Sequence, residues 1–389
     1  MNKNYIGGEW VAGADVNLNI NPSDTDDVVG EYARADAAQA HAAVDAAFDA
    51  QPAWAGFTAE QRSDALDRIG TEVLARREEL GRLLAREEGK TLAEGIGEVV
   101  RAGRVFKFFA GEALRLSGER LASIRPGVEV DVRREPEGVI GIITPWNFPI
   151  AIPAWKIAPA LAYGNTVVFK PADLVPGSAW ALAEIIVRAG ALPAGVFNLV
   201  MGPGSKVGDV FAKSRKVRAV TFTGSTGTGR QVGLACMERG AKVQLEMGGK
   251  NPLIILDDAD LEQAVEVAVS GSYFSTGQRC TASSRLIVQD SIHDRFVEAV
   301  VQRLAALKVD NALAEGCDIG PVVSQAQLKQ DCDYIDIARH EGGNLVFGGE
   351  LLERATDGFY LSPALITETG NDMRINREEV FGPVASASS

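Results

Sequence analysis

Six short, continuous apolar runs in the middle of the chain constrain the fold most strongly. They are VIGIIT (139–144), TVVFK (166–170), FNLVM (197–201), AVTFT (219–223), VQLEM (243–247) and PLIIL (252–256). Strands that are covered on both faces of a sheet have this texture, because every side chain meets protein. Helical patterns such as SAWALAEIIVRAG (178–190) separate several of the runs. The sequence therefore predicts an α/β fold built on a parallel sheet.

The flanking regions predict helices and hairpins. Residues 35–116 have a helical pattern, which is clearest at 58–90, where apolar residues recur every three or four positions. NYIGGEWV (4–11) is typical of a short strand with a glycine turn, and 124–138 predict a polar hairpin that turns at Pro126 and Gly127. A helical stretch, LEQAVEVAVSGSYFS, leads to Cys280, and a strand, SRLIVQ, follows it.

Charge and apolar content exclude several classes of partner. The 389 residues are 46% hydrophobic and carry a formal net charge of −13. An acidic chain has no general attraction for phosphate backbones or anionic lipid, so we expect neither nucleic acid nor membrane partners. No signal-like segment opens the chain and no apolar run reaches the roughly 18 residues that a membrane span needs. We therefore expect a cytoplasmic protein.

The thiol of Cys280, in FSTGQRCTASSR (274–285), is either a nucleophile or a packed core residue. The four cysteines lack the spacing of a zinc site, and so few in a long chain do not suggest a disulfide framework, so we expect no metal. The three histidines are in no motif-like setting, and a Cys-His protease is therefore not indicated. A nucleophilic Cys280 would depend on backbone amides and a carboxylate base.

Glu246 is the candidate for that base. It is the single charge in the apolar run VQLEMGG. A buried carboxylate is costly, and burial raises its pKa toward neutrality, as a general base requires. The alternative is a residue at the end of a strand that points to water.

Three further stretches carry polar groups at the ends of predicted strands. TPWNFP (144–149) fixes the neutral donor Asn147 between two prolines, which suits an oxyanion hole. FKPAD places Lys170 where α/β folds bind ligands. FTGSTGTGR (222–230) is a glycine-rich turn that leads into a helix, where backbone amides bind anions, although its spacing is not G-x-G-x-x-G.

Taken together, the motifs resemble those of the NAD(P)-dependent aldehyde dehydrogenase superfamily. TPWNFP, FKPAD, FTGSTGTGR, LEMGGKNP, GQRC and EEVFGP occur in this order. The resemblance implies a Rossmann-like, parallel-sheet NAD(P)-binding domain (1–123 and 139–247), an oligomerisation hairpin (124–138) and an α/β catalytic domain (248–389). It also implies homodimers or homotetramers.

The resemblance assigns roles to individual residues. Cys280 would attack the aldehyde to give a thiohemiacetal and then a thioester, Asn147 would stabilise the oxyanion, and Glu246 would activate the hydrolytic water. Cofactor binding, with NAD or NADP, would involve eight positions: Trp146, Lys170, Asp173, Gly224, Ser225, Gly229, Glu379 and Phe381. Asp173 stands where NAD-preferring members commonly have Glu, so the sequence leaves the choice of NAD or NADP open.

The stretches around Lys170 and Cys280 look most like those of bacterial 2-oxoglutarate semialdehyde dehydrogenases, with succinate semialdehyde as the close alternative substrate. The substrate entrance would be lined by Phe148, Trp155 and the helix that carries Arg101 and Arg104. A dicarboxylic semialdehyde needs a cation for its far carboxylate, and arginine offers a bidentate partner. Arg101 is our candidate, with Arg279 as a weaker one. The alternative is that Arg101 and Arg104 are solvated.

Family members continue beyond EEVFGPVASASS, so the sequence predicts a chain truncated at its C-terminus, with an incomplete catalytic domain. ASASS resembles a frameshift scar. Two hypotheses rival an active aldehyde dehydrogenase. The first is a truncated, catalytically inactive chain that keeps the fold and cofactor binding, and the second is a thioester-forming acyltransferase that uses the same cysteine. The second gives no reason for Lys170 and Glu379.

Overall fold

The computed structural model describes all residues, 1–389, and divides them into two compact units. Unit 1 comprises Met1–Asn19, Gly30–Leu80 and Ile96–Glu246, and unit 2 comprises Ile20–Val29, Gly81–Gly95 and Met247–Ser389. These units differ from the expected domains in two segments, since 20–29 and 81–95 belong with the C-terminal residues. Each unit has its own sheet.

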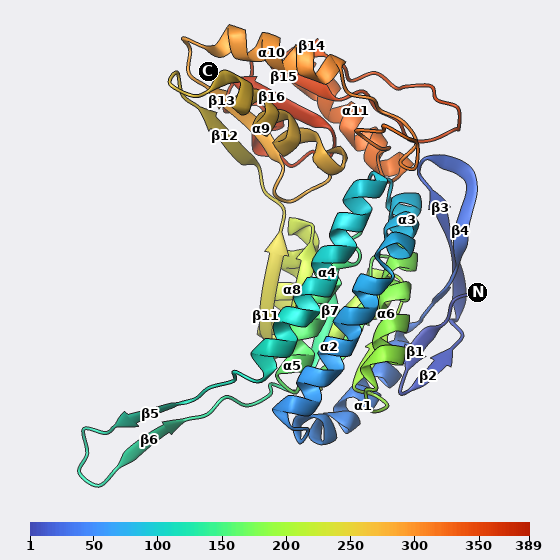
Figure 1. Cartoon of the computed structure of the whole chain (residues 1–389), viewed down its shortest axis with the longest axis vertical. Coiled ribbons are helices and arrows are strands. Elements are labelled where there is room, and N and C mark those ends of the chain that lie inside the picture. The colour runs from blue at the N-terminus through green and yellow to red at the C-terminus, as the bar shows by residue number, and fades with distance from the viewer. The chain divides into compact units, whose positions relative to one another are not determined.

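Unit 1 is built on a seven-stranded sheet with the order β11-β10-β7-β8-β9-β1-β2 (Figure 1). Strands β10, β7, β8 and β9 run parallel to one another, whereas β1 runs antiparallel to β9 and to β2. The bounds are β1 (Asn4–Ile6), β2 (Glu9–Val11), β7 (Val139–Ile143), β8 (Thr166–Lys170), β9 (Phe197–Leu199), β10 (Val217–Gly224) and β11 (Lys242–Met247). The predicted parallel sheet is confirmed.

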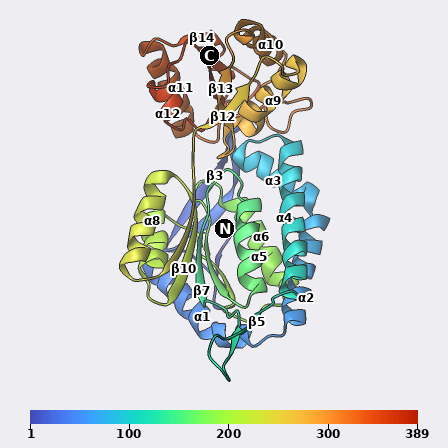
Figure 2. The ribbon, with the colours of Figure 1, turned by 90° about the vertical axis from the view of Figure 1, so that its left-hand side faces the viewer.

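Helices cover both faces of this sheet, as Figure 2 shows. Helices α5 (Ala151–Ala162) and α6 (Pro176–Gly190) lie on one face and pack against α2 (Ala59–Ala75). On the other face are α1 (Ala37–Ala55), α7 (Asp209–Lys213), which continues the π-turn η1 (Gly204–Gly208), and α8 (Thr226–Glu238). The region predicted to be helical at 35–116 contains two further helices, α3 (Arg77–Glu88) and α4 (Leu92–Ala113).

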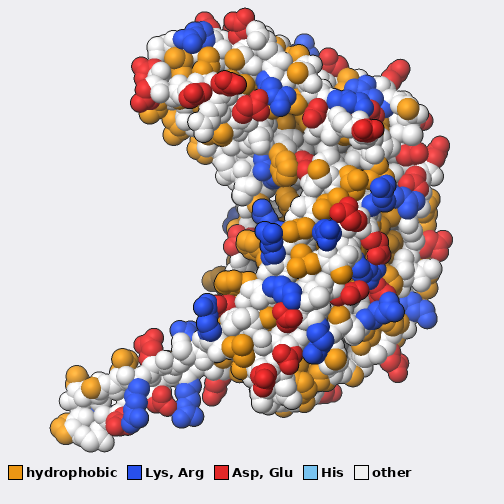
Figure 3. All heavy atoms as spheres, viewed as in Figure 1, with side chains coloured by type: hydrophobic (Ala, Val, Ile, Leu, Met, Phe, Trp, Pro, Cys, Tyr) orange, Lys and Arg blue, Asp and Glu red, His pale blue; other side chains and the backbone are white.

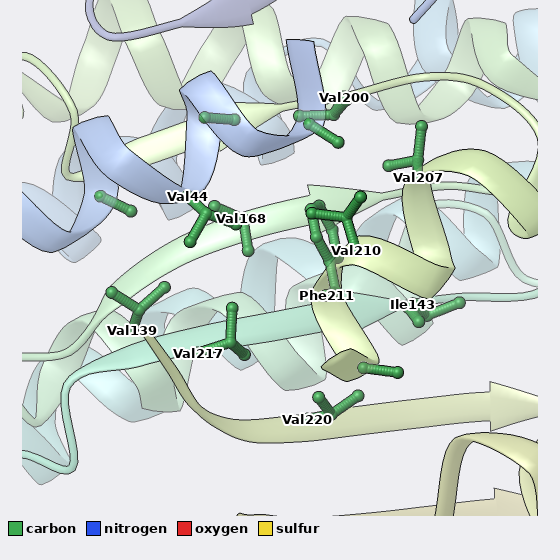
Figure 4. Packing of buried hydrophobic residues seen from close by; sticks show 14 of the residues in the cluster. Val44, Val139, Ile143, Val168, Val200, Val207, Val210, Phe211, Val217 and Val220 are labelled. Carbon is green, nitrogen blue, oxygen red and sulfur yellow. The ribbon is translucent and has the colours of Figure 1, made fainter. Parts of the chain in front are cut away.

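The face under α1 and α7 is filled by β-branched side chains (Figure 4). Val139, Val168 and Val220 come from three adjacent strands, and Val44 and Phe211 pack over them from α1 and α7. Valine suits a pleated surface that is covered on both sides, which is why the runs in this part of the sequence read as continuously apolar.

The strand order places three of the predicted motifs at one edge of the sheet. The chain runs outward from β7 through β8 to β9, then returns to place β10 on the other side of β7. In such sheets, ligands bind outside the carboxyl ends of the strands, at the point where the order reverses. TPWN follows β7, KPAD follows β8, and the glycine turn follows β10.

Two hairpins complete the N-terminal half. One pairs β3 (Asp15–Asn21) with β4 (Asp24–Arg34), and the other pairs β5 (Glu119–Ala122) with β6 (Glu129–Val132). The predicted turn at Pro126 and Gly127 is right, and Gly127 has a φ of +75°. The predicted bounds of 124–138 are wrong, because the first strand precedes them and 133–138 form no strand. Strand β5 has the sequence ERLA, and its two charged residues leave no recognisable alternation of apolar and polar residues.

Unit 2 holds a five-stranded sheet with the order β12-β13-β16-β15-β14, in which only β14 is antiparallel to its neighbour. Helices α9 and α10 cover one face, and α11 and α12 the other. The bounds are β12 (Asn251–Ile255), α9 (Leu261–Tyr273), β13 (Ser283–Val288), α10 (His293–Ala305), α11 (Gln325–His340), β14 (Asn344–Phe347), β15 (Ala364–Thr367), α12 (Arg374–Arg377) and β16 (Val384–Ser388).

The C-terminal residues ASASS lie in strand β16 and at its end. Strand β16 lies between β13 and β15, with Ala385 and Ala387 fully buried under one helical layer and Val384 under the other. Small side chains fill this position because helices close over both faces of a central strand.

None of the helices is long and apolar enough to cross a membrane. Cytoplasmic localisation stays a prediction.

Candidate active site

Cys280 is exposed at the end of an unusual turn in unit 2. Helix α9 ends at Tyr273 and leads into the 3₁₀ turn η2 (Phe274–Gly277), where Ser275 and Thr276 have φ values of 50° and 57° and Gly277 of 68°. Left-handed backbone at two non-glycine residues is costly and persists only where the surroundings hold it. The alternative that Cys280 is a packed core thiol is wrong.

Buried hydrogen bonds hold this turn in place. The backbone N–H of Ser275 donates to Glu94 Oε1 at 2.7 Å, and Thr276 Oγ1 donates to the carbonyl of Gly320 at 3.1 Å. Gln278 accepts a bond from the N–H of Val323 at 3.0 Å. All these partners belong to unit 2. The position of the thiol is thus set by residues that no sequence motif singled out.

Arg279 places a positive charge beside the thiol. Its guanidinium donates to the carbonyls of Ser270 and Gly271, at 3.1 and 2.6 Å, and lies 4.8 Å from the ring centroid of Phe274. Burial lowers the pKa of Arg279, while the charges of Glu94 and Cys280 raise it. A nearby cation favours the thiolate form of a cysteine. Both bonds come from Nη2, whereas the buried Nε atom of Arg279 has no hydrogen-bond partner.

Glu246 lies near the end of β11 in unit 1 and is exposed, so the predicted burial is wrong. Strand β11 is the edge strand of its sheet. Val243 and Leu245 pack on the core, whereas the alternate residues Gln244 and Glu246 are exposed. Val243 and Leu245 made VQLEM look like a continuous apolar run, although its side chains alternate between core and solvent.

A polar network lies behind Glu246 that sequence reasoning missed. Lys156 Nζ donates to Thr221 Oγ1 at 2.7 Å and to Gln244 Oε1 at 3.2 Å, and Gln244 Nε2 donates to Glu246 Oε1 at 2.7 Å. Burial lowers the pKa of Lys156 to about 8, with Glu246 opposing the shift. A lone lysine in the apolar helix AIPAWKIAPALA was the available signal.

Asn147 is buried in the loop between β7 and α5, 3% exposed. The start of α5 is capped by Glu98, whose Oε1 accepts the backbone N–H groups of Ile150 and Ala151 at 2.9 and 3.0 Å. Trp146 and Phe148, on either side of Asn147, are half-buried. Glu98 therefore positions this loop, and it was not recognised in the sequence.

Lys170 is the last residue of β8, and Asp173 lies in the loop after it. The charges of the two side chains interact. Lys170 is buried, its Nζ donates to the carbonyl of Pro171 at 2.6 Å, and burial lowers its pKa to about 8 against the opposing charge of Asp173. Asp173 Oδ2 also accepts a bond from Arg34 Nη2 at 2.7 Å. Asp173, which we expected at the cofactor site, thus already has an arginine partner.

The glycine-rich turn after β10 starts α8. Ser225 is the N-cap and accepts a bond from the N–H of Thr228 at 3.4 Å. Gly224 has no room for a side chain because a methyl group there would overlap the ring of Phe222. Gly229 is buried, and its N–H donates to the carbonyl of Ser225 at 2.9 Å. Exposed residues of the first turn leave the amide end of α8 open to an anion.

Glu379 and Phe381 lie in unit 2, in the segment that precedes β16. The Glu379 carboxylate packs against Gly248, where a methyl group would overlap it. Burial raises the pKa of Glu379, while the N–H of Gly249 and the charge of Lys250 lower it. Phe381 has a φ of 65°, which is uncommon for an aromatic residue.

An apolar cavity of about 590 Å³ in unit 1 joins Arg101, Arg104 and Trp155. Phe108 and Phe109 of α4 complete its wall, and Phe148 is not part of it. Both arginines are exposed at the residue level and neither has an acidic partner within 4 Å among the ion pairs of the protein. A cavity with apolar walls and two cations suits an organic anion.

The arrangement distributes the predicted residues over the two units. Cys280, its neighbour Arg279, Glu379 and Phe381 belong to unit 2, and the other predicted site residues belong to unit 1. No group of three or more His, Cys, Asp or Glu side chains could hold a metal ion.

Sequence comparison settles the family. The profile of the aldehyde dehydrogenase family matches residues 10–389. This chain belongs to the aldehyde dehydrogenase family. Among curated relatives, it is 44% identical to an alpha-ketoglutaric semialdehyde dehydrogenase of Bacillus subtilis, over 98% of this chain and 79% of that protein. It is 38% identical to an NADP(+) succinate-semialdehyde dehydrogenase of Escherichia coli, over 98% of this chain and 78% of that protein.

Solved structures of aldehyde dehydrogenases have the same fold. A crystal structure of betaine aldehyde dehydrogenase from Staphylococcus aureus, in complex with NAD+, superposes with a TM-score of 0.97 at 37% identity. The match covers 100% of this chain and 78% of that structure. The enzyme is thus an aldehyde dehydrogenase with the α/β fold that its motifs predict, and that resemblance is confirmed. The comparisons do not support the predicted truncation.

Proposed function

We propose that this aldehyde dehydrogenase oxidises a dicarboxylic semialdehyde, such as 2-oxoglutarate semialdehyde, to the corresponding acid with NAD+ or NADP+. The observation that carries the substrate class is the apolar cavity with Arg101 and Arg104, since an arginine fork matches a carboxylate. The similarity to semialdehyde dehydrogenases points in the same direction. Succinate semialdehyde is the nearest alternative.

The residues present fit a dinucleotide cofactor. Buried Lys170 and the open amide end of α8 lie at the carboxyl edge of one sheet, where α/β folds bind nucleotides. Lys170 would hold the adenosine ribose and Ser225 the pyrophosphate. Glu379, whose carboxylate is set on Gly248, would hold the nicotinamide ribose, with Trp146 and Phe381 nearby.

In the proposed mechanism, the Cys280 thiolate attacks the aldehyde carbon and gives a thiohemiacetal. The oxyanion accepts hydrogen bonds from the Asn147 amide and the backbone N–H of Cys280. Bound NAD+ or NADP+ supplies the hydride acceptor, and loss of hydride from the thiohemiacetal carbon leaves a thioester on Cys280. The exposure of Cys280 and the charge of Arg279 support the first step.

Glu246 removes a proton from the water that attacks the thioester, and the acid then leaves Cys280. The hydrogen bond from Gln244 orients one Glu246 oxygen, and Lys156 holds Gln244 in turn. A general base must have a carboxylate within reach of a water, and an exposed Glu246 meets that condition.

The decisive experiment measures NADH and NADPH formation with 2-oxoglutarate semialdehyde, succinate semialdehyde and propanal. We expect the highest kcat/KM for one of the two charged semialdehydes. A preference for propanal would contradict the proposed substrate class, and no turnover of any aldehyde would contradict the mechanism.

We also propose that the β5–β6 hairpin forms an interface between copies of the chain. Leu121, Val130 and Val132 share one face of it and are 50%, 39% and 41% exposed. An isolated two-stranded hairpin is only marginally stable in water, and an exposed apolar face adds to that cost. Figure 3 shows apolar side chains gathered at the tip of this hairpin and charged ones along it.

A further inference from the structure

A buried carboxyl group on α11 has a role in neither the proposed mechanism nor the core. Asp331 is fully buried. Its Oδ1 accepts a hydrogen bond from Gln327 Nε2 at 2.9 Å, whereas its Oδ2 is inaccessible to water and has no hydrogen-bond partner. A buried polar atom without a partner costs free energy, so its position requires an explanation.

Burial favours the uncharged form of the Asp331 carboxyl group. Burial raises the pKa of its carboxyl group to about 8, and the bond from Gln327 opposes this shift only in part. The charged residues two positions away on α11, Lys329 and Asp333, pair with each other. A neutral carboxyl group offers one donor and one acceptor, as an asparagine does.

Asp331 and two neighbours on α11 hold the segment that carries Glu379 and Phe381. The Nε2 atoms of Gln327 and Gln330 both donate to the carbonyl of Val380, at 3.0 and 2.8 Å. The Asp331 carboxyl lies directly on Gly382, where a methyl group would overlap all three of its terminal atoms. Gly382 directly follows Phe381. Phe381 has a left-handed backbone, which persists only where the surroundings hold it.

The same segment abuts the turn that leads to Cys280. A methyl group on Gly277 would overlap the carbonyl of Gly382, so the two backbones are in contact. Gly277 has a φ of 68° and lies three residues before Cys280. A displacement of Gly382 would therefore move the backbone on the nucleophile side as well as the segment with Glu379.

We propose that Asp331 is a positioning residue, which supports Gly382 and thereby fixes both the Glu379–Phe381 segment and the turn before Cys280. The inference rests on the proposed roles of Cys280, Glu379 and Phe381. In this proposal Asp331 acts through Gly382, and through the Gln327 amide that also binds Val380, rather than on substrate or cofactor directly.

The test compares Asp331→Ala and Asp331→Asn in the full chain. Asp331→Ala removes the support. We expect the Kd for NAD+, measured by calorimetry, to rise about tenfold and the rate constant for iodoacetamide alkylation of Cys280 to fall by roughly ten- to a hundredfold, because small misplacements at a reactive site have effects of this size. Asp331→Asn keeps the shape and the donor and should restore both. Asp333→Asn, which removes an exposed charge two residues away, is the matched control and should change neither.

Three controls separate positioning from general damage. Alkylation is followed on the Cys280 peptide by mass spectrometry, so that the neighbouring Cys332 does not contribute. The amount of reactive Cys280 is titrated, since partial unfolding lowers that amount but leaves the rate constant of the folded fraction unchanged. If Asp331→Ala does not fold, Asp331→Ser replaces it.

A double-mutant cycle tests the contact itself. Gly382→Ala alone should cause the same loss as Asp331→Ala, because its methyl group displaces the carboxyl. In Asp331→Ala/Gly382→Ala the vacated space admits the methyl group, so the combined loss should be clearly smaller than the product of the two. Multiplicative losses, or an alanine variant at position 331 that matches the wild type, would overturn the inference.

Alkylation and NAD+ binding need no aldehyde, so these results stand whichever substrate is turned over. Failure of the proposed function has another signature: a wild-type enzyme that oxidises no semialdehyde, or a Cys280 that iodoacetamide does not modify.

Discussion

Cys280 combines an exposed side chain with a backbone that its surroundings hold under strain. Each non-glycine residue in a sparsely populated backbone region costs about 1–3 kcal/mol, and Ser275 and Thr276 are two such residues in succession. Glu94 and Gly320 offset that cost by binding the turn directly. The turn formed by Ser275 and Thr276 leads to an exposed thiol, whereas the sequence alone also allowed Cys280 to lie in the core.

Replacement of the thiol tests its role most directly. Cys280→Ser should lower kcat for aldehyde oxidation by at least roughly 10³-fold, because loss of a nucleophile removes the step on which all later steps depend. NAD+ affinity, measured by calorimetry, should stay within about twofold. Cys317→Ser serves as the control and should keep wild-type kcat. NADH formation by the Cys280→Ser enzyme at the wild-type rate would exclude the mechanism.

Glu246→Gln keeps the side-chain shape but removes the proton acceptor. Loss of a general base costs about 10² to 10⁴ in rate, and deacylation should then limit turnover. Stopped-flow measurements should show a burst of NADH equal to the enzyme concentration, followed by slow steady-state formation. Gln244→Leu, which removes only the orienting bond, should have a smaller effect of the same kind. A steady-state rate equal to that of the wild type would remove Glu246 from the mechanism.

Arg101 distinguishes a charged from an uncharged aldehyde. A hydrogen bond to a charged group contributes about 1.5–3 kcal/mol, which corresponds to roughly ten- to a hundredfold in binding. Arg101→Ala should therefore raise KM for 2-oxoglutarate semialdehyde by that factor and leave KM for propanal nearly unchanged. Lys107→Ala removes the same charge from α4 on the side that binds Asp67, and should affect neither. Equal changes in KM for both aldehydes would show that Arg101 does not bind the substrate carboxylate and is a solvated surface residue.

At the scale of elements, the order of the parallel strands brings distant motifs to one edge. TPWN and the glycine turn are about 80 residues apart in the sequence, yet β7 and β10 pair directly. Hydrophobic runs predict that each strand is buried on both faces, but they do not encode which strand is its neighbour. That order comes from the crossover helices, which return the chain to the middle of the sheet.

The β5–β6 hairpin has one apolar and one charged face, and this difference gives a prediction about assembly. Val130→Lys puts a charge on the apolar face that holds Leu121 and Val132, and should shift the oligomer toward smaller species in sedimentation velocity. Ala122→Lys adds the same charge to the opposite face, beside Glu129, and should leave the distribution unchanged. Identical behaviour of both variants would argue against an interface on the apolar face.

At the scale of the whole molecule, Asp331 links stability to pH. Its carboxyl pKa is about 8 in the folded protein and near 4 when unfolded, so between these values the unfolded chain releases a proton that the folded protein retains. Stability therefore falls as pH rises through this range, by about 1.4 kcal/mol per pH unit at most for one group. Asp331→Asn does not titrate, so its melting temperature should exceed that of the wild type at pH 8, and the difference should shrink toward pH 5. A difference that is constant with pH would contradict the raised pKa.

The sequence by itself determined the fold class and the family. Six apolar runs became six strands, and the family that the ordered motifs resemble is the one whose profile matches residues 10–389. Apolar runs report burial, and burial is a local property that a sequence records. Only the tertiary structure decided that β12 belongs to a second sheet. It also decided that Glu246 faces outward from an edge strand, and that Asp331 supports Gly382 from 51 positions away. Each of these depends on which elements become neighbours, and that is fixed by packing across the whole chain.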